Sequence, residues 1–236
     1  MRKIDPILGA LQTATTLEQV GQIVTKLRDE YGTAHAIYHV IGDSGEEYGA
    51  YTYDQDWVNH YISEGYGQVD PSVLHCLRSF GPVNWADGDW SAPRARNLLV
   101  EAVDGGVGKH GMSIPVRGAN GQMAMFSVST YEKDDLWDKF RGEYLNDLLL
   151  ASHYLHIKSA EIMGDAYQAP LPSLSPRERD VLTLLAAGVS RSEAAEKLKI
   201  SEHTFRVYVD SSRKKMGTMN TVHTVAKALT AGLILP

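Results

Sequence analysis

The chain of 236 residues is long enough for one large domain or two ordinary ones, and its 43% hydrophobic and 22% charged residues are typical of globular proteins. Those values exclude a wholly disordered chain and a collagen-like fibre. A single cysteine, Cys76, excludes an internal disulfide framework and a cysteine-rich zinc site. Because the sequence shows neither a membrane-spanning apolar run nor a signal peptide, we expect a cytoplasmic protein with no membrane partner.

The net charge of −6 is unevenly distributed along the chain. Residues 1–170 carry 13 Lys and Arg against 23 Asp and Glu, whereas residues 171–236 carry 10 against 6. An acidic region followed by a basic one predicts two modules with different partners. The basic module is suited to approach an anionic polymer such as nucleic acid.

The first predicted element is an amphipathic helix over residues 16–31, in which apolar residues recur at helical spacing and Thr16 is the candidate cap. Residues 34–41 are rich in β-branched and aromatic side chains and predict a strand, which a second strand over 48–53 follows. Helical spacing then predicts three short helices over residues 56–63, 71–78 and 94–107.

The strongest hairpin signal lies between residues 111 and 129. Apolar runs over 111–116 and 122–129 flank residues 117–121, which contain the turn-forming pair Asn120-Gly121. A long helix follows over 143–163, and its wide apolar stripe fits either one broad core face or an additional face for a second subunit. The first module is therefore predicted to be α+β, with an antiparallel sheet surrounded by helices.

Two prolines in residues 165–173 predict a linker between a first domain over 1–164 and a second domain over 174–236. The second domain reads as four helices. The first helix begins at Ser175-Pro176, and the second begins at Ser190 or Ser192. The third begins at Ser201, and the fourth covers residues 221–233. We expect an all-α domain.

The second and third of these helices are short and nearly adjacent, with small alanines at their contact, which is the pattern of a helix-turn-helix. A plain four-helix bundle with a basic surface is the alternative. If the third helix enters the major groove, residues near its start face base edges and the basic residues near its end face phosphates. The predicted DNA contacts are Glu202, His203, Thr204, Arg206, Arg213, Lys214 and Lys215.

Four segments of the second domain closely resemble the LuxR-type helix-turn-helix. They are Leu174-Ser-Pro-Arg-Glu-Arg-Asp-Val-Leu182, Ala186-Ala-Gly188, Ala194-Ala-Glu-Lys-Leu-Lys-Ile-Ser201 and Thr204-Phe-Arg206. In the first domain, the order and spacing of a second residue set resemble the autoinducer-binding domain of LuxR-type quorum-sensing regulators. That set is Trp57, Tyr61, Asp70-Pro71, Trp85 and Gly111.

This resemblance covers residues from about 15 to 236 and implies an α/β/α sandwich that binds an N-acyl-homoserine lactone. It also implies a homodimer that binds a near-palindromic site in double-stranded DNA and acts on RNA polymerase. At the matching positions, Trp57 donates to the lactone carbonyl, Asp70 accepts from the amide N–H, and the hydroxyls of Tyr53 and Ser127 bind the amide carbonyl. Tyr61 and Trp85 form aromatic walls. No cofactor is implied besides the signal ligand.

The sequence departs from the family in the third helix of the second domain. Tyr208 stands where many relatives have His or Lys, and Asp210 stands where some have a cation. Asp210 repels phosphate unless it pairs, with Arg206 or Arg213. The ligand tail, the operator and the choice between activation and repression stay open. Two alternatives also stay open, namely a regulator tuned to another small amphiphile and a regulator that needs no ligand.

Two other classes of protein fit the sequence poorly. A response regulator needs a phosphoacceptor Asp within regular βαβ alternation, which the hairpin of the first module contradicts. An enzyme needs an arranged nucleophile, base or metal set, and the histidines and Cys76 have none of the required spacings. We therefore expect no catalytic and no metal-binding residues.

Overall fold

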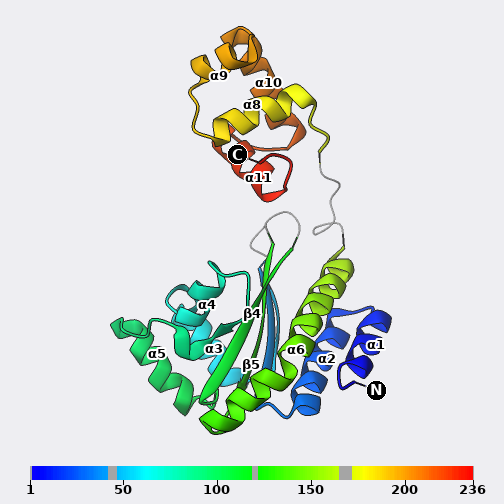
Figure 1. The fold of residues 1–236 in the computed structure, drawn as a ribbon, viewed down its shortest axis with the longest axis vertical. Helices are drawn as coiled ribbons and strands as arrows, with labels where there is room; N and C mark the ends of the chain where they lie inside the picture. Colours follow the sequence, from blue (N-terminus) through cyan, green and yellow to red (C-terminus); the bar gives the residue numbers. More distant parts are fainter. Residues whose placement is uncertain (1, 42–46, 119–121, 165–171, 236) are drawn as a thin grey trace. The chain divides into compact units, whose positions relative to one another are not determined.

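The computed structural model describes residues 2–41, 47–118, 122–164 and 172–235 (Figure 1). Within these residues the contacts separate into two compact units, one that ends at Gly164 and one formed by the residues from 172 onward. Residues 165–171 of the predicted linker lie outside the described residues. The boundaries of the linker and of the two domains therefore stay predictions.

The first unit contains a five-stranded antiparallel sheet in the order β2-β1-β5-β4-β3. The predicted hairpin forms its centre, and the turn residues 119–121 lie outside the described part of the chain. The strands are β1 (His35–Ile41), β2 (Glu47–Tyr51), β3 (Val83–Asn84), β4 (His110–Arg117) and β5 (Met123–Thr130).

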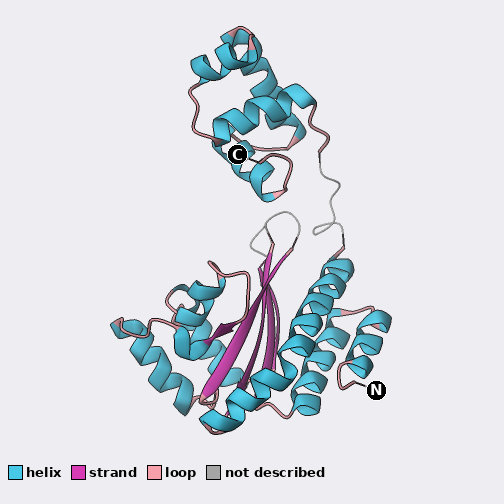
Figure 2. Cartoon of the chain, viewed as in Figure 1, coloured by secondary structure: helices cyan, strands magenta, loops and turns pink. Residues whose placement is uncertain are grey.

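Helices cover both faces of this sheet (Figures 1 and 2). On one face lie α1 (Asp5–Thr13), α2 (Leu17–Tyr31) and α6 (Asp134–Met163), and on the other lie α3 (Gln55–Ser63), α4 (Pro71–Cys76) and α5 (Pro93–Asp104). Single 3-10 turns, η1 (Tyr66–Gln68) and η2 (Trp85–Asp87), connect the second layer. The predicted α/β/α sandwich with an antiparallel sheet is confirmed.

The structure adds two helical segments that local patterns did not predict. Helix α1 has only nine residues, too few to be stable alone, and it forms because Ile7 and Leu11 are buried where α1 contacts α2 and α6. Helix α6 begins at Asp134, nine residues before the predicted start. Its first turns are mostly charged and bury Trp137, so their apolar pattern is too sparse to predict a helix.

The second unit is the predicted all-α domain. It consists of α8 (Pro176–Ala186), α9 (Arg191–Leu198), α10 (Glu202–Lys215) and α11 (Thr221–Thr230) around a core that includes Phe205, Val181 and Leu182. Ser190, not Ser192, caps α9, because its hydroxyl accepts from the Glu193 N–H. Ser201 caps α10 as predicted. Within the described parts of the chain, we find no helix both long and apolar enough to span a membrane.

Candidate functional site

The sheet face beneath α3, α4 and α5 carries side chains in rows, because every second residue of a strand faces the same side. Ser127 of β5 pairs with Ile37 of β1 and with Ser113 of β4, which makes one row. Met125 and His39 pair in the next row. These rows form the floor of a cavity of about 810 Å3, a volume typical of small-molecule sites.

All six residues predicted to contact the ligand line this one cavity. They come from β5, from α3, from η2 and from the segments that precede α3 and α4, which are distant in sequence. The structure thus brings the predicted set together around a single space. The set is Tyr53, Trp57, Tyr61, Asp70, Trp85 and Ser127.

Asp70 combines a structural role with a position at the cavity. Its Oδ1 atom caps α4 by accepting from the backbone N–H of Ser72 at 2.8 Å and from the Ser72 hydroxyl at 2.7 Å. Its Oδ2 atom accepts from the Tyr61 hydroxyl at 2.9 Å. A carboxylate oxygen can accept more than one hydrogen bond, so Oδ2 retains capacity for a donor from a ligand.

Two tyrosines at the cavity, Tyr53 and Tyr61, are protonated donors. Burial raises the pKa of Tyr61 far above its usual range, and the neighbouring carboxylate of Asp70 raises it further. Burial likewise raises the pKa of Tyr53, whose ring lies 4.7 Å from that of His35. Both phenols therefore present an O–H at every physiological pH.

A chain of hydrogen bonds crosses the cavity floor. The indole N–H of Trp85 donates to the Ser113 hydroxyl at 2.8 Å, and the Ser113 and Ser127 hydroxyls are also 2.8 Å apart. Ser113 was not predicted as a site residue. The signal that identifies it is the strand pairing with Ser127, which no local pattern in β4 reveals.

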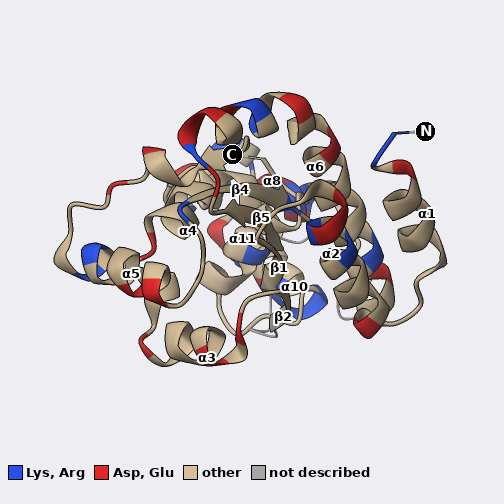
Figure 3. Ribbon diagram, turned by 90° about the horizontal axis from the view of Figure 1, so that it is seen from below, with Lys and Arg blue, Asp and Glu red and all other residues tan. Residues whose placement is uncertain are grey.

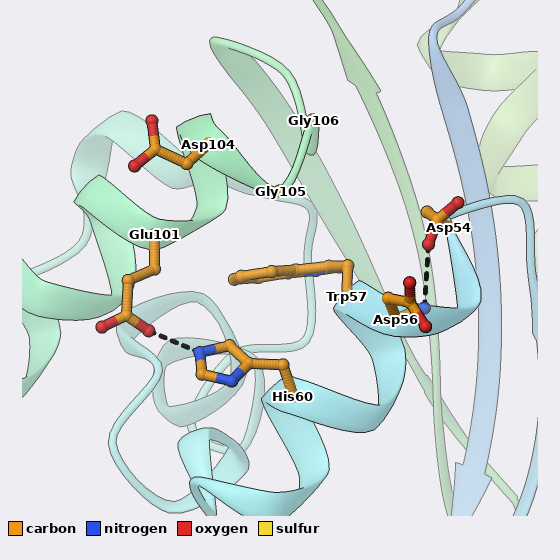
Figure 4. Close-up of a pocket in the computed structure, with 8 residues that line it drawn as sticks. All are labelled: Asp54, Asp56, Trp57, His60, Glu101, Asp104, Gly105 and Gly106. Atoms are coloured by element: carbon orange, nitrogen blue, oxygen red, sulfur yellow. Dashed lines mark hydrogen bonds and ion pairs between the residues drawn. The ribbon is translucent and has the colours of Figure 1, made fainter.

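Trp57 is held from outside the cavity. Figure 4 shows its ring between the backbone at Gly105 and the ring of His60, whose centroid is 5.9 Å away. His60 Nε2 lies 2.7 Å from a carboxylate oxygen of Glu101, which also accepts from the Tyr66 hydroxyl at 2.6 Å. Among the described residues the Trp57 N–H has no acceptor, so it is available to a ligand.

The same Trp57 ring is a wall of a second, smaller recess of about 540 Å3 between α3 and α5 (Figure 4). Hydrogen bonds from Tyr66 and His60 lower the pKa of Glu101, so the recess carries negative charge. Within the described residues there is no cluster of three His, Cys, Asp or Glu side chains suited to a metal. The recess is lined by Asp54, Asp56, Trp57, His60, Glu101, Asp104, Gly105 and Gly106.

Gly111 is required by the position of Trp85. A Cβ atom added at Gly111 would lie 2.2 Å from Cε3 of the Trp85 ring, far closer than atoms pack. We expect Gly111→Ala to displace Trp85, break its hydrogen bond to Ser113 and lower the stability of the first unit by about 1–3 kcal/mol, the usual cost of overpacking. Denaturant unfolding of the full chain measures the loss.

The matched control is Gly9→Ala on α1, where an added Cβ meets nothing within 4 Å. Its stability should be at least that of the unmodified protein. An equally unchanged stability in Gly111→Ala would show that the close packing of Trp85 on Gly111 does not contribute to the fold.

The predicted DNA contacts lie on α10. Glu202, His203, Arg206 and Lys214 are exposed. Thr204 is half-buried, and its hydroxyl lies 2.9 Å from that of the cap residue Ser201. Figure 3 shows Asp and Glu in red at several places on α3, α5 and α6 of the first unit. In the second unit, α10 therefore presents an exposed face that carries cations.

Two of the basic residues on α10 are paired. Arg213 Nη2 lies 3.6 Å from Asp210 Oδ1, so Arg213 is the arginine that balances the charge of Asp210. Lys215 Nζ donates to Glu178 of α8 at 2.7 Å, and Glu178 also accepts from the Ser211 hydroxyl and the Ser175 N–H. Glu178 thus joins the start of α8 to the end of α10.

This network predicts a pH dependence. Burial favours a raised pKa for Glu178, but hydrogen bonds from Lys215, Ser211 and Ser175 prevail and lower it to about 2. Because the Glu178 carboxyl group has a lower pKa in the folded state than its value of about 4.3 in the unfolded chain, its ionised form stabilises the fold. This contribution is complete above about pH 5 and is lost as the pH falls from about 5 towards 2.

We expect Glu178→Gln to lower the stability of the second unit by roughly 2–3 kcal/mol at pH 7 and to remove most of its acid sensitivity. Hydrogen exchange of α8 and α10 peptides in the full chain, corrected for intrinsic rates, measures both effects. Glu196→Gln, at an exposed position on α9, is the control. Equal protection in the two variants would refute the role of the network.

Comparison with known protein families assigns both units. The model of the autoinducer binding domain matches residues 16–158, and the model described as bacterial regulatory proteins, luxR family, matches residues 172–228.

Individual proteins agree with the family models. The chain is 34% identical to the transcriptional activator protein RaiR of Rhizobium etli over 170 residues, which are 72% of this chain and 70% of that protein. It is 30% identical to the quorum-sensing regulator RhlR of Pseudomonas aeruginosa over 190 residues, 78% of this chain and 74% of that one.

The crystal structure of Escherichia coli SdiA shares the fold at a TM-score of 0.69 and 22% identity, covering 99% of this chain and 98% of that chain. The autoinducer-binding model alone matches more than half of the chain, and the luxR model matches most of the second unit, so the two models together show the family. The chain belongs to the LuxR family of quorum-sensing transcriptional regulators, with an autoinducer-binding domain and a helix-turn-helix domain, and it is not an enzyme.

Proposed function

We propose that the first unit binds an N-acyl-homoserine lactone in the 810 Å3 cavity and that the protein binds a near-palindromic operator as a homodimer. The observation that carries the lactone proposal is the convergence of six side chains on one cavity, with donors and acceptors suited to the ligand. Family membership makes this class of signal the first choice.

The polar groups at the cavity complement the ligand. An N-acyl-homoserine lactone has two carbonyl acceptors, one on the lactone ring and one on the amide, and one amide N–H donor. Each of these groups costs about 1–3 kcal/mol if it is buried without a partner. The free N–H of Trp57 suits the lactone carbonyl, and Oδ2 of Asp70 suits the amide N–H. Tyr53 and Ser127 suit the amide carbonyl, and the apolar surface of Tyr61 and Trp85 encloses the head group.

Ligand binding then stabilises the first unit. The cavity separates the sheet from α3 and α5, so the lactone contributes contacts to an otherwise incomplete core. By mass action, a ligand at a hundred times its dissociation constant adds about 2.7 kcal/mol to the free energy of unfolding.

The homodimer proposal rests on α6. Leu148, Ala151 and Leu155 are buried against the unit, whereas Tyr154 and Ile157 of the same helix are exposed by 38% and 60%. This second apolar face fits a copy of the same chain. In such a dimer, two helix-turn-helix units reach DNA half-sites that lie one helical turn apart. We expect the dimer to act in the cytoplasm, with RNA polymerase as a further partner.

A salt titration tests the DNA contacts. If α10 and its partner's α10 neutralise several phosphates, the logarithm of the association constant should fall linearly with the logarithm of salt concentration, with a slope of about −0.9 per contact. Fluorescence anisotropy with an operator duplex measures that slope. A slope near zero would contradict binding through the basic face.

The lactone proposal is tested by thermal unfolding of the full chain with N-octanoyl-homoserine lactone and with its ring-opened form. We expect the lactone to raise the midpoint by several degrees. The ring-opened compound should not, because it places a carboxylate beside Asp70. Equal effects of the two compounds, or no effect of any acyl-homoserine lactone, would overturn the proposal.

A further inference from the structure

The turn that follows α5 forms the seat of the Trp57 ring. A Cβ atom added at Gly105 would lie 2.3 Å from Cε3 of Trp57, so the ring packs directly on the backbone of this turn (Figure 4). The turn continues through Gly106, whose φ of +74° is the left-handed conformation that favours glycine. Because the ring and the turn are in contact, the position of the turn constrains the direction of the Trp57 N–H.

His35 joins this turn to the segment that carries Tyr53. The imidazole Nε2 atom lies 2.8 Å from the Gly106 carbonyl oxygen, and Nδ1 lies 3.0 Å from the Thr52 carbonyl oxygen. Both carbonyls are acceptors, so the imidazolium donates to both of them, whereas either neutral tautomer donates to one. The half-buried imidazole also packs against the Tyr53 ring, with the two centroids 4.7 Å apart.

The register of the sheet explains why His35 reaches the turn. His35 begins β1 and pairs with Ser129 of β5, in the row next to that of Ser127 on the cavity floor. The Ser129 hydroxyl donates to the Val107 carbonyl, so both members of this row contact the turn. From an exposed position, the Tyr131 hydroxyl donates to the same carbonyl as His35.

We propose that His35 is a positioning residue for the lactone head group, and that it holds the turn so that the Trp57 N–H meets the lactone carbonyl. The inference rests on the proposed function, because this hydrogen bond exists only if the cavity holds a lactone. His35 is not among the described residues that line the cavity, so its effect on affinity passes through its neighbours. A hydrogen bond weakens steeply when its angle is distorted, so a displaced indole loses the bond but keeps its apolar contact.

The test isolates the hydrogen bond of Trp57 with two probes, N-octanoyl-homoserine lactone and N-cyclopentyloctanamide. The second compound keeps the amide and the tail, but a cyclopentane ring replaces the lactone and removes its carbonyl. We expect the unmodified full-length protein to bind the lactone about 5- to 100-fold more tightly, because the amide probe leaves a buried indole N–H unpaired. Trp57→Phe removes this N–H, so its affinity ratio defines the value without the bond.

Two substitutions of His35 separate its two hydrogen bonds. Glutamine places an NH2 group near the position of Nε2, so His35→Gln should keep the bond to Gly106 and most of the affinity ratio. Asparagine is shorter and places its NH2 group near Nδ1, so His35→Asn should keep only the bond to Thr52. Its ratio should fall towards that of Trp57→Phe. A merely structural role would weaken the binding of both probes alike and leave the ratio unchanged.

His75→Asn is the matched control, because it is the same substitution at an exposed position on α4 that does not line the cavity. It should keep the full ratio. Tyr131→Phe provides a second test if His35→Asn does not fold. It removes the other donor to the Gly106 carbonyl, and His35 should hold the turn, so most of the ratio should remain. Loss of the ratio in Tyr131→Phe would assign the turn to Tyr131 and overturn the proposal.

The outcomes separate the two proposals. If the unmodified protein binds both probes equally, or if His35→Asn keeps the full ratio, the positioning role of His35 is refuted and the lactone pocket stands. If no acyl-homoserine lactone binds, the proposed function itself fails.

Discussion

Asp70→Asn is expected to lower the affinity for a homoserine lactone by about 100-fold and to abolish the ligand response. The substitution replaces the acceptor Oδ2 with an NH2 group, which meets the Tyr61 hydroxyl and the ligand amide, both of them donors. Loss of a hydrogen bond to a charged group costs about 1.5–3 kcal/mol, and the unpaired donors add to that cost. Isothermal titration and a promoter reporter measure the two effects.

The fold should survive this change. Asn caps helices about as well as Asp, and its carbonyl oxygen keeps the bonds from Ser72 that begin α4. Asp54→Asn is a matched control, since Asp54 caps the neighbouring helix α3 and lines the outer recess instead of the main cavity. If both variants bound the lactone as the unmodified protein does, the assignment of Asp70 would be wrong.

Arg206→Ala is expected to reduce binding to the operator by about 10- to 100-fold per half-site. Arg206 is exposed on the second turn of α10, and no other described residue pairs with it. A bidentate contact between arginine and guanine contributes about 1–3 kcal/mol of discrimination between bases. Binding to unrelated duplexes should weaken far less, so the ratio of specific to non-specific affinity should fall.

Lys214→Ala distinguishes base reading from charge. Lys214 is exposed near the end of the same helix, where phosphates are expected. Its removal should weaken binding to all sequences alike and reduce the salt slope by about one. An Arg206→Ala protein that behaved like Lys214→Ala, with its sequence preference intact, would remove the base-reading role of Arg206.

The sequence predicted the architecture where local signals and burial agree. The helix over 17–31 has a capping box at Thr16 and a regular apolar stripe, and the hairpin combines two apolar runs with a turn pair. In the second unit, serine caps define the starts of α8, α9 and α10. Helix α1 was missed because it depends on tertiary contacts with α2 and α6.

The site was predictable only in part, for the same physical reason. Trp57, Asp70 and Trp85 are recognisable as a spaced motif, and the structure places all three at one cavity. Ser113 and the support of Trp57 by His60 and Glu101 depend on which strands and helices become neighbours. Likewise, the pairing of Lys215 with Glu178 joins residues that are far apart in sequence.

The central claim, that the cavity holds a homoserine lactone, is tested most directly by the ligand that the protein retains. The full chain would be expressed with a mixture of alkyl- and aryl-homoserine lactones, purified and denatured, and the extract analysed by mass spectrometry. Our account predicts one lactone at close to one equivalent per chain, and none from Asp70→Asn. A well-folded protein that retained no lactone from the mixture would contradict it.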